Sequence, residues 1–88
     1  MHPVLFTFRP STSARQQDEK LLQISAWQGI AAANHLMRDT EHDNVRRMCY
    51  AYVIQLSDVD KIVKELKALP EIEYSGVPAE REQINARR

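Results

Sequence analysis

The most constraining feature of the sequence is an alternating run in the middle of the chain, followed at once by a helical pattern. The run extends from Val45 to Leu56 and alternates two sets of residues: Met48, Tyr50, Tyr52, Ile54 and Leu56 against Arg47, Cys49, Ala51, Val53 and Gln55. A period of two residues predicts a β-strand. Ser57 and Asp60 then form a capping-box pair, and apolar residues recur at helical spacing as far as Pro70: Val59, Ile62, Val63, Leu66 and Leu69. We therefore expect a strand and a helix in succession.

The beginning of the chain has the same order of patterns. Between Pro3 and Pro10, Val4, Phe6 and Phe8 alternate with other residues, which predicts a strand. Ser13 and Gln16 then form a capping-box pair. One helical face follows, with Leu22 and Trp27 flanking it: Ala14, Gln17, Leu21, Ile24 and Gln28. We expect this helix to stop at Gly29, because glycine readily adopts the conformation that ends helices.

Residues 30–38 allow two interpretations. Their alanines would prolong the first helix, whereas the interruption at Gly29 favours a new element, and we predict a second strand. Residues 39–44 form a polar loop, and Ile72 and Tyr74 mark a short last strand that Gly76 and Pro78 end. The order β-α-β-β-α-β predicts an α+β, ferredoxin-like sandwich, in which two helices cover one face of a four-stranded antiparallel sheet. Residues 1–78 would form this domain, and residues 79–88 a flexible tail.

Composition excludes several function classes. The 88 residues are too few for two cores, and twelve Lys and Arg balance twelve Asp and Glu. No basic face therefore indicates nucleic acid or an anionic membrane as partner. No stretch has the length of a membrane span or the pattern of a signal peptide. A single cysteine, Cys49, leaves no internal disulfide.

Candidate catalytic and metal-binding residues are few. His2, His35 and His42 have no sequence spacing that joins them to Cys49, and no C-x-x-C or H-x-x-x-H pair occurs. Glycines are isolated, so no phosphate-binding loop is predicted. We expect no enzyme activity, no metal and no cofactor, and we interpret His35 as a strand side chain and Cys49 as a small hydrophobic residue.

The uncovered face of the sheet is the first functional clue, because both sets of residues 45–56 are largely apolar. The larger residues would face the helices: Phe6, Phe8, Tyr52, Ile54, Leu56, Ile72 and Tyr74. A smooth outer surface of small residues would remain: Thr7, Cys49, Ala51, Val53 and Ser75. Such a surface suits docking against another protein, although ordinary scatter of surface apolar residues is the alternative.

Residues 48–53 are also somewhat similar to the aromatic strand motif of the RNA-recognition fold, whose rings stack on bases. Met48 and Cys49 stand where that motif has a basic residue and a glycine. We therefore regard nucleic acid as an unlikely partner and interpret Tyr50 and Tyr52 as core residues. A ferredoxin-like regulatory or protein-interaction module is the other alternative.

The run that begins at Tyr50 resembles the second half of the propeptides of subtilisin-like serine proteases. The most telling residues are Val63-Lys64-Glu65-Leu66-Lys67, followed by Pro70-x-Ile72-x-Tyr74. Leu5-Phe6-Thr7-Phe8-Arg9 is similar to the opening strand of that family, and Gly29-Ile30 to its exit from the first helix. The resemblance covers most of residues 4–78.

This resemblance implies an inhibitor or intramolecular chaperone of a subtilisin-like serine protease, acting in cis or in trans. The bare sheet face would pack on surface helices of the protease, with Thr7, Ala51 and Val53 in the docking face. The chain from Val77 onward would enter the substrate cleft as an added strand. The residues expected in this tail are Val77, Pro78, Ala79, Glu80, Arg81, Glu82, Arg87 and Arg88.

The dibasic pair Arg87-Arg88 is similar to the cleavage end of propeptides in the kexin and furin branch. Arg88 would then pair with carboxylates in an acidic specificity pocket, and a frayed polar tail is the alternative. A complete chain of this kind would be cytoplasmic, whereas one excised from a protease precursor would be secreted.

Overall fold

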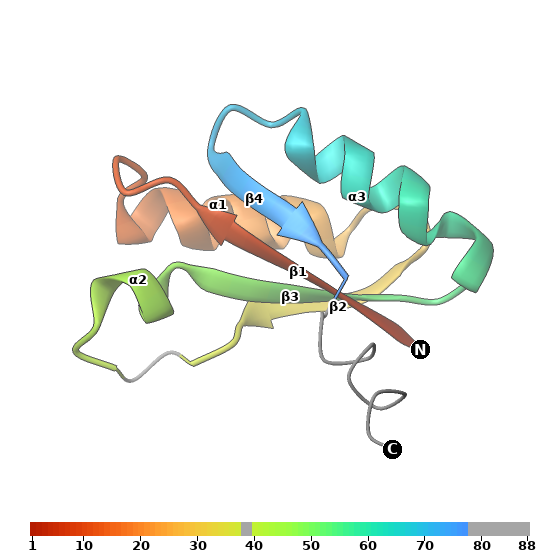
Figure 1. Ribbon diagram of the computed structural model, residues 1–88, viewed down its shortest axis with the longest axis horizontal. Coiled ribbons are helices and arrows are strands. Elements are labelled where there is room, and N and C mark those ends of the chain that lie inside the picture. The colour runs from red at the N-terminus through yellow and green to blue at the C-terminus, as the bar shows by residue number, and fades with distance from the viewer. Residues whose placement is uncertain (38–39, 78–88) are drawn as a thin grey trace, which may run out of the picture.

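The computed structural model describes residues 1–37 and 40–77. The elements follow the chain in this order: β1 (His2–Phe8), α1 (Ala14–Ser25), β2 (Ile30–His35), α2 (Asp43–Arg46), β3 (Met48–Val53), α3 (Val59–Lys67) and β4 (Ile72–Gly76) (Figure 1). A short 3-10 turn, Leu56–Asp58, precedes α3. None of the helices in these two ranges is long and apolar enough to cross a membrane.

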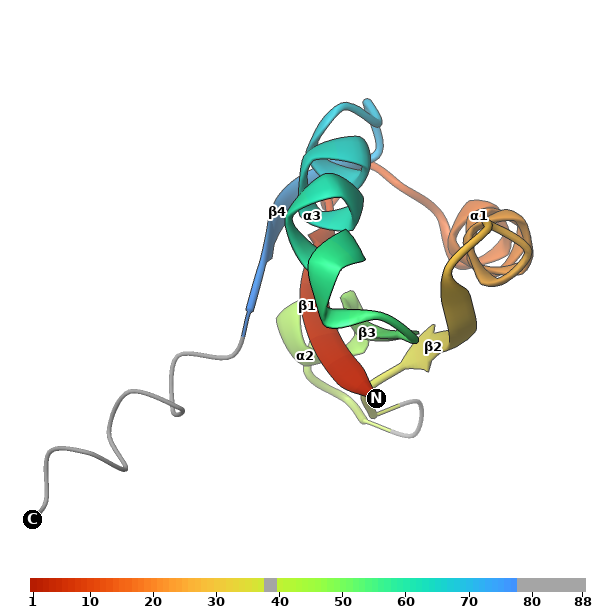
Figure 2. The ribbon, with the colours of Figure 1, turned by 90° about the vertical axis from the view of Figure 1, so that its right-hand side faces the viewer.

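The four strands form one antiparallel sheet in the order β2-β3-β1-β4. Figure 2 shows α1 and α3 on the same side of this sheet, α1 beside β2 and α3 over β1 and β4. The expected ferredoxin-like α+β fold is confirmed. Because β2 and β4 are the outer strands, β1 and β3 form the centre on which both helices converge.

The second strand is confirmed, and the extension of the first helix is wrong. The α1 helix ends at Ser25, with Ala26 as its C-cap, which is earlier than the predicted stop at Gly29. Gly29 instead has a φ of 92° and turns the chain into β2. This left-handed conformation is costly for any residue with a Cβ atom, so Gly29 positions the turn rather than the helix end.

Helix starts were predicted with mixed success. The capping box of Ser13 and Gln16 is present, with both reciprocal hydrogen bonds formed. The second box is wrong, because Leu56–Asp58 is a 3-10 turn and α3 begins after Asp58 without a side-chain cap. The helix α2 was not predicted either: its first two residues lie in the expected loop 39–44 and its last two in the expected strand 45–56, which in the structure is only Met48–Val53.

Pro3 lies inside β1 without breaking the sheet. Phe8 N donates to Arg47 O (3.0 Å) and Arg9 N donates to Glu71 O (2.8 Å). The backbone N–H and C=O groups of even-numbered β1 residues therefore bond to β3, and those of odd-numbered residues point toward the β4 side. The pairing of β4 begins only at Leu5. The nitrogen of Pro3 therefore points to the side where β1 has no partner among the described residues, which is where a strand tolerates proline.

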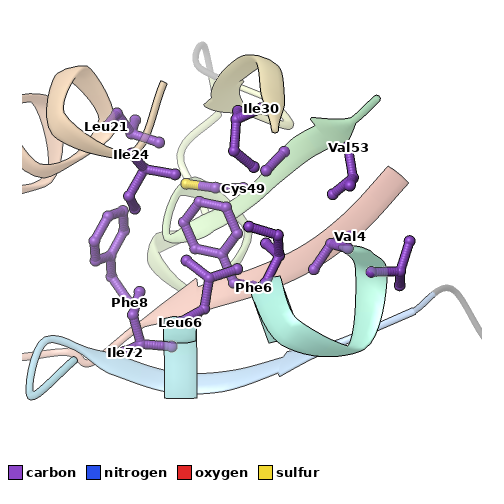
Figure 3. Close-up of a cluster of buried hydrophobic side chains, with 13 residues drawn as sticks. Val4, Phe6, Phe8, Leu21, Ile24, Ile30, Cys49, Val53, Leu66 and Ile72 are labelled. Carbon is purple, nitrogen blue, oxygen red and sulfur yellow. The ribbon is translucent and has the colours of Figure 1, made fainter. Parts of the chain in front are cut away.

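The core lies between the sheet and the two long helices. Three residues of β1, Val4, Phe6 and Phe8, are fully buried, and the rings of Phe6 and Phe8 meet edge to face at 5.7 Å. Figure 3 shows how side chains from the helices and the other strands converge on these two rings. The helices contribute Leu21, Ile24, Val59, Ile62 and Leu66.

Candidate functional site

The covered face of β3 holds the small residues of that strand. Cys49, Ala51 and Val53 are all 0% exposed and belong to the hydrophobic core, so their expected place on the docking face is wrong. The reason is steric. The phenylalanines of β1 and the aliphatic residues of α1 and α3 already fill the space under the helices, which leaves room only for small side chains on the neighbouring central strand.

The large residues of β3 lie on the uncovered face. Met48 and Tyr50 are half-buried and Tyr52 is exposed, while their neighbours along the strand are buried. The rings of Tyr50 and Tyr52 contact each other at a centroid distance of 4.9 Å and an angle of 53°. The interpretation of these two tyrosines as core under the helices is therefore wrong. Ile54 and Leu56, also expected in the core, are exposed beyond the end of the strand.

A β-bulge in β4 reverses the expected orientation of Tyr74 and Ser75. Ile72 pairs with Phe8 and Tyr74 pairs with Thr7, so Glu73 is an extra residue in β4. Ile72 is buried as expected, but Tyr74 is 54% exposed. Ser75 is 2% exposed instead of lying on the outer surface, and its Oγ donates to the carbonyl oxygen of Val63 at 2.8 Å. Of the five residues predicted for the outer surface, Thr7 alone lies on the uncovered side.

The register places the uncovered side chains in neighbouring rows. Tyr50 faces Leu5 across one strand boundary, and Met48 faces Thr7, which in turn faces Tyr74. We define the open-face surface by these residues together with the second tyrosine of β3: Leu5, Thr7, Met48, Tyr50, Tyr52 and Tyr74. Three of its six members are tyrosines, whose rings combine apolar area with a hydroxyl that can remain hydrated.

Gly76 makes room for the Tyr74 ring. A Cβ atom at Gly76 would lie 2.6 Å from the Tyr74 hydroxyl oxygen and 3.1 Å from its Cζ. The ring therefore lies along β4 over the backbone of Gly76, on the open-face surface. The sequence predicted this glycine only as the end of a strand, and its close approach to the ring carried no sequence signal.

Charged side chains border the open-face surface rather than lie within it. Arg47 donates from Nη1 to the carbonyl of Phe8 at 2.8 Å, and its guanidinium forms ion pairs with Asp43 (3.0 Å) and Glu73 (3.4 Å). The six residues of the surface are uncharged at neutral pH. A partner that binds there would need an apolar or aromatic complement more than a counter-charge.

The predicted tail lies almost entirely outside the described residues. Val77 is half-buried and packs against the core, so it belongs to the folded domain rather than to a free tail. The other expected cleft-binding residues lie outside the described ranges: Pro78, Ala79, Glu80, Arg81, Glu82, Arg87 and Arg88.

A cluster of Cys49, His35 and Asp18 was missed by the sequence reasoning. Cys49 Sγ lies 3.7 Å from His35 Nδ1, and His35 Nε2 lies 3.2 Å from Asp18 Oδ1. The three side chains come from β3, β2 and α1, so pairing of β2 with β3 brings together residues that no local spacing connects. Only the pairing register of β2 with β3, which places His35 opposite Cys49, could have indicated this contact.

The cluster has the residue types of a thiol active site but not its chemistry. His35 Nδ1, the nitrogen nearest the thiol, lies 3.1 Å from the carbonyl oxygen of Arg46, which can only accept a hydrogen bond. Nδ1 is therefore shared between this carbonyl oxygen and the thiol rather than directed at the thiol alone. Burial, with a smaller contribution from Asp18, raises the pKa of Cys49 to about 12. A protonated sulfur with no exposed surface is a packed core residue rather than a nucleophile.

No family model matches the chain, and no curated protein is significantly similar to it. Across residues 1–37 and 40–77, no three His, Cys, Asp or Glu side chains are grouped so that they could hold a metal ion. The open-face surface is the candidate site, and its uncharged, tyrosine-rich composition is compatible with protein binding.

Proposed function

We propose that this chain is a propeptide-like inhibitor or folding chaperone, or both, of a subtilisin-like serine protease, which docks through its open-face surface. The observation that carries the proposal is the uncharged, tyrosine-rich surface on the bare side of a ferredoxin-like sheet. Tyrosines supply large contact areas at low cost in conformational entropy and are enriched in the energetically dominant parts of interfaces. The sequence resemblance to this propeptide family names the partner.

The proposed mechanism has two parts that act together. The rigid sheet binds outside the active site, and residues 78–88 occupy the substrate cleft by adding a strand to it. Docking of the sheet raises the effective concentration of the tail at the cleft, so a tail with weak affinity of its own inhibits strongly. In this scheme Arg88 enters an acidic specificity pocket, where its planar guanidinium pairs with carboxylates.

The test is a titration against a panel of subtilisin-like proteases, including one specific for dibasic sites, with a chromogenic peptide as substrate. We expect stoichiometric inhibition of at least one enzyme, and a loss of roughly tenfold or more in affinity for Tyr74→Ala, as for an aromatic residue that anchors an interface. Leu22→Ala is the matched control, because Leu22 is 73% exposed on α1, away from the open-face surface. Removal of residues 79–88 should abolish inhibition and leave the domain folded.

Two results would contradict this proposal. One is the absence of inhibition across the panel while the protein is shown to be folded and intact. The other is inhibition that Tyr74→Ala and Leu22→Ala weaken equally, since that would remove the open-face surface from the interface.

A second candidate function, binding of single-stranded RNA, is favoured by one observation. Tyr50 and Tyr52 lie in contact on the uncovered face, where aromatic side chains of RNA-binding sheets stack on bases. The balanced charge of the chain opposes this function, because phosphate contacts require Lys and Arg. Binding of a fluorescent uridine oligonucleotide that weakens steeply with salt and is lost in Tyr50→Ala/Tyr52→Ala would support it over protease docking.

A further inference from the structure

A cleft on the helix-covered side of the molecule lies outside the proposed protease interface. Figure 2 shows α1 and α3 on this side of the sheet, which is opposite to the open-face surface. The cleft has a volume of about 470 Å³ and lies between α3 and the turn that follows α1. This volume falls within the range of small-molecule binding sites. The lining residues are Trp27, Gln28, Lys61, Glu65 and Ala68.

Trp27 supplies the aromatic wall of this cleft. Its backbone is held on both sides, because Trp27 N donates to Ile24 O (3.0 Å) and Ile30 N donates to Trp27 O (3.1 Å). The side chain is half-buried against the core and also lines the cleft. The indole therefore offers a fixed surface on which a second aromatic ring can stack.

The α3 helix supplies two opposite charges on the other wall. Lys61, Glu65 and Ala68 follow one another at spacings of four and three residues, so they form one row along the helix. Within residues 1–37 and 40–77, neither Lys61 nor Glu65 takes part in an ion pair. A lysine four residues before a glutamate is also the weaker of the two possible arrangements on a helix. Both charges are therefore available to a ligand in the cleft.

This row sets the order of chemical groups that a ligand must present. An anion is favoured beside Lys61, a cation beside Glu65, and apolar surface beside Ala68. At a rise of about 1.5 Å per residue, Lys61 and Glu65 are about 6 Å apart along the helix axis, so one small molecule must carry both complementary charges. A free amino acid has a carboxylate and an ammonium group on one carbon atom, whereas a residue within a peptide has neither.

From this arrangement we infer that the cleft binds a free aromatic amino acid. Lys61 pairs with its carboxylate, Glu65 pairs with its ammonium group, and its ring stacks on Trp27. Both charged side chains are exposed, so the dissociation constant should be modest, on the order of 1 mM. This site is on the opposite side of the molecule from the proposed protease interface and does not depend on it.

The test is a fluorescence titration of the whole chain with phenylalanine. Trp27 is the only tryptophan of the sequence, so emission excited at the long-wavelength edge of its absorption reports this cleft without a contribution from tyrosine or from the ligand. We expect a saturable change in this emission. Phenethylamine, which lacks the carboxylate, and hydrocinnamate, which lacks the ammonium group, should each bind roughly fivefold more weakly.

Two charge variants identify which residue holds which group of the ligand. Lys61→Gln should weaken phenylalanine binding roughly fivefold and leave phenethylamine binding unchanged. Glu65→Gln should weaken phenylalanine binding to a similar extent and leave hydrocinnamate binding unchanged. Both residues are exposed on α3, so the circular dichroism spectrum should not change. Lys64→Gln is the matched control, because Lys64 is exposed on the same helix and does not line the cleft.

Four outcomes would overturn the inference. They are no saturable change at about 10 mM phenylalanine, equal binding of phenylalanine and both analogues, equal weakening by Lys61→Gln and Lys64→Gln, or tighter binding of phosphocholine than of phenylalanine. The last result would assign the cleft to a lipid headgroup instead. Failure of protease inhibition leaves this test unaffected, since its readout is the emission of Trp27.

Discussion

The two faces of β3 differ in a way that reverses a common assumption about residue size. The covered face carries a cysteine, an alanine and a valine, whereas the open face carries a methionine and two tyrosines. The covered face is crowded because β1 and both long helices supply its bulk. The open face has no covering layer, so large side chains fit there without steric conflict. The size of a side chain therefore reflects how crowded its surroundings are. It does not by itself show which face of the strand is buried.

The largest expected effect comes from placing a charge on the covered face. Ala51→Arg should destabilise the domain by roughly 4 kcal/mol or more, since it buries an unpaired charge and overpacks a filled core. Tyr52→Arg, the next residue on the opposite face, should cost less than about 1 kcal/mol. Urea denaturation followed by circular dichroism measures both. Similar losses for the two variants would show that the faces do not differ as described.

The covered face of β3 also carries the buried thiol of Cys49, and because of this thiol the free energy of unfolding should fall at high pH. Its pKa is raised from 9.0 to about 12 in the folded state. As pH rises, the thiol therefore loses its proton first in the unfolded chain. The stability that the protonated thiol contributes is lost between pH 9 and about 12. The loss approaches about 4 kcal/mol at about 1.4 kcal/mol per pH unit.

The matched variant for this measurement is Cys49→Ala, which should be less stable than the wild type at neutral pH because it leaves a small cavity. Its disadvantage should shrink as pH rises, because only the wild type carries the thiol whose deprotonation favours the unfolded state. A pH-independent difference between the two unfolding free energies would contradict the assigned thiol shift.

A smaller effect is expected for the tyrosine contact on the open face. The ring pair of Tyr50 and Tyr52 should have a coupling energy of about 0.5–1 kcal/mol, as aromatic rings in contact on one face do. A double-mutant cycle with Tyr50→Ala and Tyr52→Ala, measured by thermal unfolding, gives this value directly. Zero coupling would mean that the rings are separately solvated rather than packed into one surface.

The smallest effect on the free energy of unfolding is expected for a substitution of Gly76, beside the Tyr74 ring. Gly76→Ala places a methyl group against the far end of the Tyr74 side chain, which can rotate away. We expect a stability change within about 0.5 kcal/mol and a clear shift of the Tyr74 ring signals in the NMR spectrum. The same variant should weaken protease inhibition if the orientation of this ring matters for docking. Unchanged ring signals would contradict its placement over Gly76.

The order of elements was predictable because its signals are local. Alternation in β1 and β3, the capping box at Ser13 and the apolar spacing of α3 each lie within a few residues of the element they mark. The start of β2 was predictable from Gly29 for the same reason. The short helix α2 lacks both a side-chain cap and a buried face, so nothing local distinguished it from a loop.

The open-face surface was not predictable from such signals, because both faces of β3 are apolar and hydropathy therefore cannot orient it. The orientation follows from the phenylalanines of β1, which already fill the covered side. For Tyr74 and Ser75, a single bulged residue, Glu73, shifts the alternation. The contact of Cys49 with His35 likewise depends on the register between two strands, which no spacing within either strand encodes.

The position of β1 in the sheet has a consequence for the order in which the domain can fold. This first strand lies between β3 and β4, so it pairs with the last strand of the described chain. Such a topology has a high contact order, and the entropy of closing the long intervening loop opposes its formation. During synthesis, β1 must wait with one edge unpaired until Ile72–Gly76 has left the ribosome. The sheet, and with it the surface at Tyr74, is therefore completed in one late step.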